Sequence, residues 1–386
     1  MGKIDKNIVY LGWVSYFTDM ASAMINPILP IFVVNILHEG YDKLGIIIAI
    51  ATFISYALRL FSGYISDCFG VVKPLVVSGY LLSALSKPLI AFSHTYQSVA
   101  FLRGIERLGK GIRSAPKDLL ISAYAKQKEE GKTFGFHKTM DIAGELCGTL
   151  LVFALLYFFG QNETMIRNIF LATLLPGLTG VMIVAFFVKD IPQKPARVHT
   201  FRITHQDRYV IKNLIFYFFF VLFVFSDSFF TMRAKTAGFE TFVIPLLFVV
   251  STATQTLVSY PVGKLIDRFG VKYLLVFAYG FGVIAQLLLW QGSLFAIWSA
   301  YAFLGLFTVI SLNANRAFIA ANANNKGSVY GVFYAGVALF GALGALLSGY
   351  VWEYFGMQTA MFMALGGTAL VWLVYMIAGD KTDVLS

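Results

Sequence analysis

Apolar runs recur about every 30 residues along nearly the whole chain, and no other feature constrains the fold as strongly. A helix that crosses a bilayer needs roughly 20 apolar residues. Twelve stretches approach or exceed this length, at about 8–36, 43–65, 74–93, 97–115, 134–159, 167–188, 210–233, 241–262, 273–291, 294–318, 329–352 and 357–378. We therefore predict an all-α integral membrane protein with twelve transmembrane helices.

The composition leaves almost nothing for a soluble domain. Charged residues make up 13% of the chain, whereas a soluble domain carries roughly 25%. Cys68 and Cys147 lie in different segments without CxxC spacing, so we expect no disulfide, no metal site and no cofactor. The first apolar stretch carries Asp19 and Pro27 and lacks a small-residue cleavage site, so we expect it to remain as the first helix.

A net charge of +10 could indicate a nucleic-acid partner or a membrane topology, and the positions of the charges decide between them. Basic residues gather in every second connection between spans, at 3–6, 73, 117–132, 189–208, 264–272, 326 and 381. The intervening connections hold little beyond Lys43, Arg167, Arg233 and Lys235. By the positive-inside rule, both termini and the middle loop are predicted to be cytoplasmic, in an inner membrane. We expect a lipid bilayer around the chain and no nucleic acid.

The two halves of the chain repeat one another. The segment 63–73 (GYISDCFGVVK) follows the second span, and the segment 263–272 (GKLIDRFGVK) follows the eighth. The residues shared by both copies are Gly63, Asp67 and Gly70, and Gly263, Asp267 and Gly270. A second pair, 131–135 (GKTFG) and 327–331 (GSVYG), enters spans five and eleven, and a fainter pair joins Asp19 in span one to Asp227 in span seven.

These offsets of roughly 196 to 208 residues mean that the second half repeats the first in order and orientation. Parallel six-helix repeats are a transporter architecture. We predict an N-terminal six-helix bundle over 1–188, a cytoplasmic linker over 189–209, and a C-terminal six-helix bundle over 210–386.

Two motifs in the sequence resemble those of a known family, and the resemblance covers essentially the whole chain. The segment 63–74 resembles the Gly-x-x-x-Asp-x-x-Gly signature that the major facilitator superfamily carries between helices two and three, and Arg107 to Gly111 resembles its helix-four signature. Two departures stand out: Val71 and Val72 replace the usual arginine pair, and helix five lacks the Gly-Pro-x-x-Gly-Gly run of many drug-proton antiporters. The resemblance implies a transporter with a substrate cavity lined by helices one, four, seven and ten.

The loop signature predicts a conformational latch. Its glycines let helix ends approach closely, and its acid can accept bonds from helix N-terminal amides or pair with a cation. The candidate latch residues are Gly63, Asp67, Gly70, Gly263, Asp267, Gly270 and Arg113. The alternative interpretation is that the two acids are ordinary solvated loop residues.

Span four is the chemical centre of the sequence, because ionisable groups inside a span are costly and are functional by default. Arg103, Arg107 and Lys110 share a helix face at i, i+4 and i+7. Glu106 can neutralise one of these cations, so the remainder must be met by other helices or by substrate. The alternative is complete internal pairing. Lys87, in span three, is expected to snorkel to the outer surface.

Several carboxylates lie at membrane depth and could carry protons. Asp141 and Glu145 in span five continue a polar stripe that starts at His137, while Asp19 and Asp227 lie in spans one and seven. A carboxyl beside an arginine can have its proton affinity switched as the pair opens and closes. We therefore predict proton coupling through these four acids, and we interpret His137 as an ordinary histidine near the membrane surface.

Further candidates for lining a substrate cavity lie in spans one and ten. They are Trp13 and Tyr16, within about one turn of Asp19, and Asn313, Asn315 and Arg316. With Arg103, Arg107 and Lys110 these favour an anionic or carboxylate-bearing organic solute, for example a metabolite or a siderophore.

The predicted function is secondary active transport by alternating access, by a monomer. A proton-driven exporter of amphiphilic drugs is the main alternative. We expect no enzyme activity, because the sequence shows no nucleophile with a base beside it, no phosphate loop and no metal-ligand cluster. A passive channel is disfavoured because the two halves repeat within one chain instead of forming a symmetric ring.

Overall fold

The computed structural model describes residues 5–69, 71–125, 130–191 and 203–378. Within these ranges, the side chains of residues 59–69, 130, 131, 267 and 378 are not described. The described residues form helices and no strand, as the apolar runs predicted. They divide into two compact units: unit 1 comprises Met1–Glu39 and Ile50–Thr200, and unit 2 comprises Gly40–Ala49 and Phe201–Ser386. The predicted domain limits at 188 and 210 stay a prediction.

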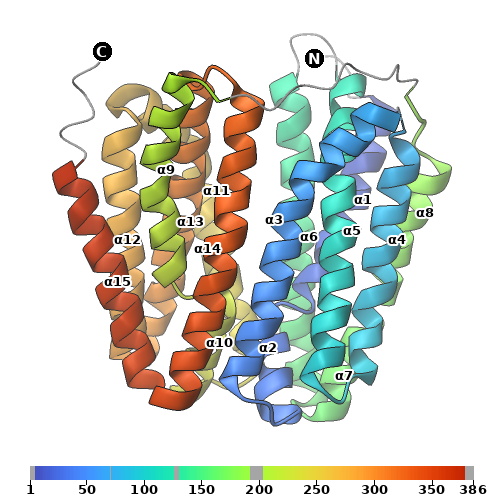
Figure 1. The fold of residues 1–386 in the computed structure, drawn as a ribbon. Helices are drawn as coiled ribbons and strands as arrows, with labels where there is room; N and C mark the ends of the chain where they lie inside the picture. The colour runs from blue at the N-terminus through green and yellow to red at the C-terminus, as the bar shows by residue number, and fades with distance from the viewer. Residues whose placement is uncertain (1–4, 70, 126–129, 192–202, 379–386) are drawn as a thin grey trace. The chain divides into compact units, whose positions relative to one another are not determined.

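The helices of unit 1 run back and forth across the bundle (Figure 1). They are α1 (Lys6–Ala23), α2 (Leu29–Ile31), the π-helical turn η1 (Phe32–Ile36), most of α3 (Tyr41–Phe69), α4 (Lys73–Leu89), the 3-10 turn η2 (Ile90–Phe92), α5 (Tyr96–Tyr124), α6 (Glu130–Phe159), α7 (Glu163–Ala172) and α8 (Leu174–Phe186).

Unit 2 repeats the arrangement. Its helices are α9 (His205–Phe223), α10 (Asp227–Thr236), α11 (Ile244–Phe269), α12 (Val271–Gln291), α13 (Leu294–Asn322), α14 (Lys326–Phe355) and α15 (Met357–Ala378). The repeat extends to helix contacts, since α1 packs on α6 in unit 1 and α9 packs on α14 in unit 2.

Glycines bring these paired helices close together. A Cβ on Gly144 or Gly148 of α6 would collide with the backbone carbonyl of Tyr16 or Met20 on α1. In unit 2, a Cβ on Gly344 of α14 would collide with the carbonyl of Leu222 on α9. The two units therefore use the same device, close backbone approach through small residues, to join equivalent helices.

Ten of the twelve predicted spans are long and apolar enough to cross a membrane within the described part of the chain. The two that are not among them correspond to predicted spans one and four, which contain α1 and α5. Both carry the polar residues that the sequence singled out. The helices least suited to lipid are thus the ones expected to carry the chemistry.

Predicted spans one, six and seven are each interrupted in the structure. In span one, α1 ends at Ala23 and helix resumes at Leu29, because Pro27 cannot donate a backbone hydrogen bond and disfavours helix at the residue before it. In span seven, Val224 and Ser226 are extended, and Asp227 begins α10. In span six, α7 and α8 meet at Thr173.

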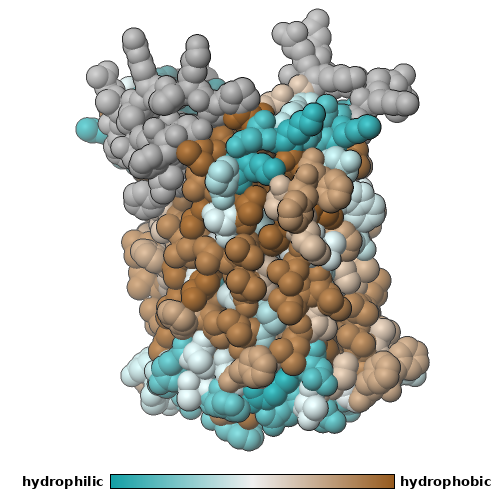
Figure 2. Space-filling view, turned by 90° about the vertical axis from the view of Figure 1, so that its right-hand side faces the viewer, coloured by the Kyte–Doolittle hydropathy of each residue, from teal (hydrophilic) through white to brown (hydrophobic). Residues whose placement is uncertain are grey.

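Apolar side chains cover the outside of the helices. Figure 2 shows a hydrophobic belt across the middle of the face of unit 1, with hydrophilic residues toward both ends. Phe101, Phe158 and Phe186 are among the exposed large apolar side chains of unit 1. A soluble protein rarely exposes apolar surface on this scale, so the belt is the lipid-facing surface of a multi-pass membrane protein.

Four of the seven latch candidates fall where the structure does not describe them. Gly70 lies outside the described residues, and Gly63, Asp67 and Asp267 lie among those whose side chains are not described. Gly270 is described, and its φ of 81° requires glycine at the junction of α11 and α12. Gly263 lies within α11 with open space around it. The latch itself stays a prediction.

Candidate functional site

The charged residues of span four lie on α5, in the interior of unit 1. This helix begins at an N-cap, Thr95, whose side chain accepts a hydrogen bond from the backbone of Ser98. Arg103, Glu106 and Arg113 are all buried. Burying charges is costly unless they are paired and hydrogen-bonded, so the partners of these residues determine what the site can do.

Glu106 is shared between two arginines on its own helix. Its Oε2 lies 2.5 Å from Nη1 of Arg103 and 3.6 Å from Nε of Arg107. Arg103 also donates from Nη2 to Oδ1 of Asn26, at 3.2 Å. The break in span one places Asn26 there, directly before Pro27. Both arginines are therefore paired with Glu106, and the side chain of Arg107 is 20% exposed.

Lys87 was expected to snorkel to the surface, and this prediction was wrong. The residue is only 1% exposed, and its Nζ donates to the backbone carbonyl of Thr18 on α1 at 3.3 Å. Electrostatic interactions link it to Glu106 and Asp19. Lys87 therefore adds another cation to the interior of unit 1. Nothing in the sequence of α4 alone shows that its neighbours are α1 and α5.

Arg113, a latch candidate, is held between α5 and α4. Its Nη1 donates to Oγ of Ser83 at 2.9 Å, and its guanidinium lies over the ring of Tyr80, 4.2 Å from the centroid. Ser83 in turn donates to the backbone carbonyl of Glu106 at 3.0 Å. Ser83 thus links Arg113 to the backbone of Glu106. The sequence did not reveal this connection.

The polar stripe on α6 contacts α1. His137 is only 5% exposed and lies in the early turns of α6, and its interpretation as a histidine near the membrane surface stays a prediction. Its Nε2 lies 2.9 Å from Oγ of Ser15, and its Nδ1 lies 3.4 Å from Oδ1 of Asp141. Asp19 is half-buried and interacts electrostatically with both His137 and Lys87. Glu145, two turns beyond His137, is also half-buried.

Trp13 and Tyr16 form part of an aromatic group on α1. Trp13 is 43% exposed, and its ring centroid lies 5.3 Å from that of Tyr16. Tyr16 packs edge-on against Phe17 at 5.2 Å.

The candidates in unit 2 are less tightly connected. Asp227 is exposed in the first turn of α10, where the partial positive charge of a helix N-terminus favours a carboxylate. Arg316 on α13 donates from Nη2 to the hydroxyl of Tyr334 at 3.4 Å, and its buried Nε has no partner among the described residues. Asn313 is half-buried. Among the candidates of unit 1, Lys110 on α5 is half-buried as well.

Comparison with known proteins places the chain in a family. The family model of the Major Facilitator Superfamily matches residues 11–253 and 228–383. The uncharacterized MFS-type transporter MJ1317 of Methanocaldococcus jannaschii is 29% identical over 371 residues, covering 91% of this chain and 89% of that protein.

Two further likenesses cover almost the full length. The multidrug resistance protein MdtH of Salmonella arizonae is 23% identical over 398 residues, covering 98% of this chain and 90% of that protein. The crystal structure of the nucleoside transporter NupG matches the fold with a TM-score of 0.79 and 12% identity, covering 97% of this chain and 100% of that one. With its two units of helices and a family model that matches nearly its whole length, the chain belongs to the major facilitator superfamily.

Proposed function

We propose that this protein is a secondary active transporter that carries a small, anionic organic solute across the inner membrane by alternating access, coupled to protons. Carboxylate metabolites and siderophores are the substrate classes in view. The observation that carries the proposal is the excess of positive charge inside unit 1.

That excess can be followed along α5. Arg103, Arg107, Lys110 and Arg113 lie within three turns of one another, and Glu106 is the acid among them. Its carboxylate lies closest to Arg103. A guanidinium that retains some exposure, as on Arg107, can hold a carboxylate bidentately. An anionic solute would therefore supply charge that the helix itself lacks.

Proton coupling is supported by the half-buried acids of the same unit. Asp19 interacts electrostatically with Lys87 and His137, and Asp141 contacts His137. Carboxyl groups in such surroundings respond strongly to the presence or absence of a neighbouring charge. We propose that substrate binding near Arg107 changes the proton affinity of these acids. The predicted cytoplasmic termini and inner-membrane location belong to the same proposal.

A second candidate function is proton-driven export of amphiphilic drugs. The similarity to the multidrug resistance protein MdtH favours it. Helix α6 carries Gly144 and Gly148 but lacks the glycine-proline run typical of many such antiporters. A lipophilic cation would also meet the same cationic α5 unfavourably.

Purified protein, screened by thermal shift against carboxylates and lipophilic cations, separates the two functions. A carboxylate is expected to raise the melting temperature, and Arg107→Lys and Arg107→Ala should weaken that carboxylate progressively. Loss of a buried charged contact costs about 2 to 5 kcal/mol, well over tenfold in affinity. Arg208→Lys, an exposed cation on α9, is the control. A stable Arg107→Ala variant with unchanged affinity would remove this residue from the site, and stabilisation by cations alone would favour drug export.

A further inference from the structure

Lys87 is a buried ionisable side chain to which the proposed function gives no part. It lies in the last turn of α4 and is only 1% exposed. A lysine is almost never fully buried unless its charge is paired. When it is buried, its amine can lose the proton, which an arginine does not do. The contacts of Nζ therefore decide whether Lys87 is a fixed cation or a carrier of protons.

The amine of Lys87 is held weakly. Its Nζ donates to the backbone carbonyl of Thr18 at 3.3 Å, and among the described side chains no carboxylate forms a salt bridge with it. An ammonium has three N–H donors, and burying it with one of them bonded is costly. The geometry therefore suits a group that can give up its positive charge.

The bond to Thr18 ties the amine to the turn of α1 that carries Asp19. Thr18 directly precedes Asp19, which is half-buried and interacts electrostatically with Lys87. Helix α8 packs closely on both α1 and α4 at this level. A Cβ on Gly180 would lie 3.1 Å from Oγ1 of Thr18, and one on Gly177 would lie 3.1 Å from Cβ of Ala84. The packing thus holds the two helices of the amine and the carboxyl together.

Further charges around Lys87 come from α5. Glu106 favours the ammonium form, whereas Lys110 and Arg113 disfavour it. The carboxylate of Glu106 already pairs with the two arginines of its own helix. The nearest acid of α5 is therefore shared among several cations, and it compensates Lys87 only in part.

The remaining helices that pack on α4 leave this balance to Asp19. Helix α8 has no titratable residue in its sequence. Helix α7 has Glu163 and Arg167, which pair with each other at 2.7 Å. Asp19 is thus the acid whose protonation can decide whether Lys87 keeps its charge.

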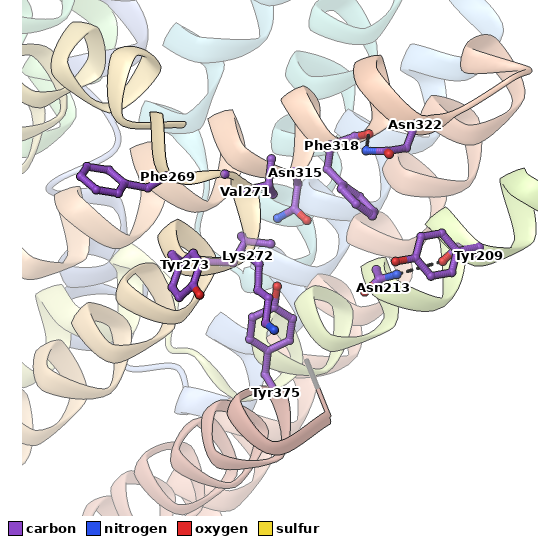
Figure 3. A pocket seen from close by; sticks show the side chains of 12 residues that line it. Tyr209, Asn213, Phe269, Val271, Lys272, Tyr273, Asn315, Phe318, Asn322 and Tyr375 are labelled. Carbon is purple, nitrogen blue, oxygen red and sulfur yellow. Dashed lines mark hydrogen bonds between the residues drawn. The ribbon is translucent and has the colours of Figure 1, made fainter. Parts of the chain in front are cut away.

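The buried amine is a property of unit 1 and is not required by the fold. Helix α12 is the counterpart of α4 in the order of spans, and the charged residue in its sequence is Lys272. Lys272 lies in the first turn of α12, at the wall of a cavity of about 270 Å³ (Figure 3). Toward the other end of α12, the buried polar residue is Gln286, an amide that does not titrate.

We propose that Lys87 carries a proton in exchange with Asp19, an inference that rests on the proposed proton coupling. In one state Asp19 is a carboxylate and Lys87 is an ammonium. In the other state, an N–H bond of Nζ has broken and an O–H bond has formed on Asp19, which leaves a neutral amine beside a carboxylic acid. The transfer changes no net charge. An anionic solute near Arg107 adds negative charge to the cluster and favours the ammonium, so solute and proton are taken up together.

The test needs neither a solute nor a pH gradient. Melting temperatures of the purified full-length protein in detergent are measured from about pH 6 to pH 10 for the wild type, Lys87→Met and Lys87→Arg. The cost of the buried ammonium disappears as the amine loses its proton. The wild type should therefore gain stability relative to Lys87→Met as the pH rises, by roughly 2 °C for each tenfold difference in proton affinity. Lys87→Arg should show no such gain, because arginine stays protonated. Lys212→Met, at an exposed lysine on α9, should follow the wild type at every pH.

Asp19→Asn keeps Lys87 and removes its acid, so it tests the pair even where Lys87→Met fails to fold. Its gain in stability should begin about one unit lower in pH than that of the wild type, because the carboxylate no longer favours the ammonium. A constant difference between the wild type and Lys87→Met at all pH values would overturn the proposal, as would an Asp19→Asn curve that coincides with the wild type. Either failure leaves the proposed transport function standing, since solute binding and accumulation test that function separately.

Discussion

At the scale of single residues, unit 1 concentrates its charges where three helices meet. Glu106 on α5, Lys87 on α4 and Asp19 on α1 interact electrostatically although they are far apart in sequence. Removing one member of such a group strands the others, because an unpaired buried charge is costly. Asp19 is half-buried and interacts electrostatically with Lys87, so its side chain is the member of this group chosen for the first test.

Asp19→Asn is therefore expected to abolish proton-driven accumulation while leaving substrate exchange at least partly intact. The amide keeps the size of the side chain and removes the group that gains and loses a proton. Transport by reconstituted vesicles is measured with and without an imposed pH gradient, alongside counterflow exchange. Asp118→Asn, an exposed acid on α5, is the control. Unchanged dependence on the pH gradient would mean that protons are not coupled through Asp19.

The sequence located the charges of the candidate site but not their partners. Arg103, Glu106 and Arg107 were recognisable because ionisable residues within an apolar run stand out. Lys87 was misjudged, since a lysine near a span end snorkels or is buried depending on which helix faces it. Asn26 and Ser83 carry no charge, and membrane spans tolerate uncharged polar residues, so nothing in the sequence distinguishes these two. Their roles depend on contacts between helices, which no single segment encodes.

At the scale of helices, two discontinuities recur in equivalent places. Spans one and seven, at corresponding positions in the two units, break after α1 and after α9. The first break presents Asn26 to Arg103, and the second places Asp227 at a helix start. Transporters commonly use broken helices to turn backbone and side-chain polar groups toward a site. Pro27 signalled the first break, whereas only the Ser-Asp pair at 226–227, a typical helix start, hinted at the second.

The close packing of α1 on α6 leads to a stability prediction. Gly144→Ala should lower the melting temperature, because the new methyl group meets the Tyr16 carbonyl and overpacking costs about 1 to 3 kcal/mol. Gly135→Ala on the same helix has open space, so the better helix propensity of alanine, about 1 kcal/mol, should leave it neutral or stabilised. Thermal midpoints of both variants in one detergent check this. A Gly144→Ala protein as stable as Gly135→Ala would contradict the close approach of the two helices.

At the scale of the whole molecule, the parallel repeat and the charge asymmetry of the loops support one another. An even number of spans separates the segment 63–73 from its counterpart at 263–272, so both must lie on the same side of the membrane. Both segments end in a basic residue, Lys73 and Lys272, and the positive-inside rule predicts that this side is cytoplasmic. The membrane spans and their repeat were predictable because hydropathy and loop charge can be read directly along the sequence. The pairing of side chains depends on contacts between helices and cannot be read in this way.

The orientation of the chain can be tested directly with reporters that are active on one side of the membrane only. A fusion after Lys194, in the basic connection between the units, should be cytoplasmic, and a fusion after Glu163, at the start of α7, should be periplasmic. A third fusion after Lys272 should match the first, because the repeat places it on the same side as Lys73. Reversal of all three would overturn the orientation while keeping the repeat. Disagreement between the first and third would instead contradict the even number of spans between them, and with it the equivalence of the two halves.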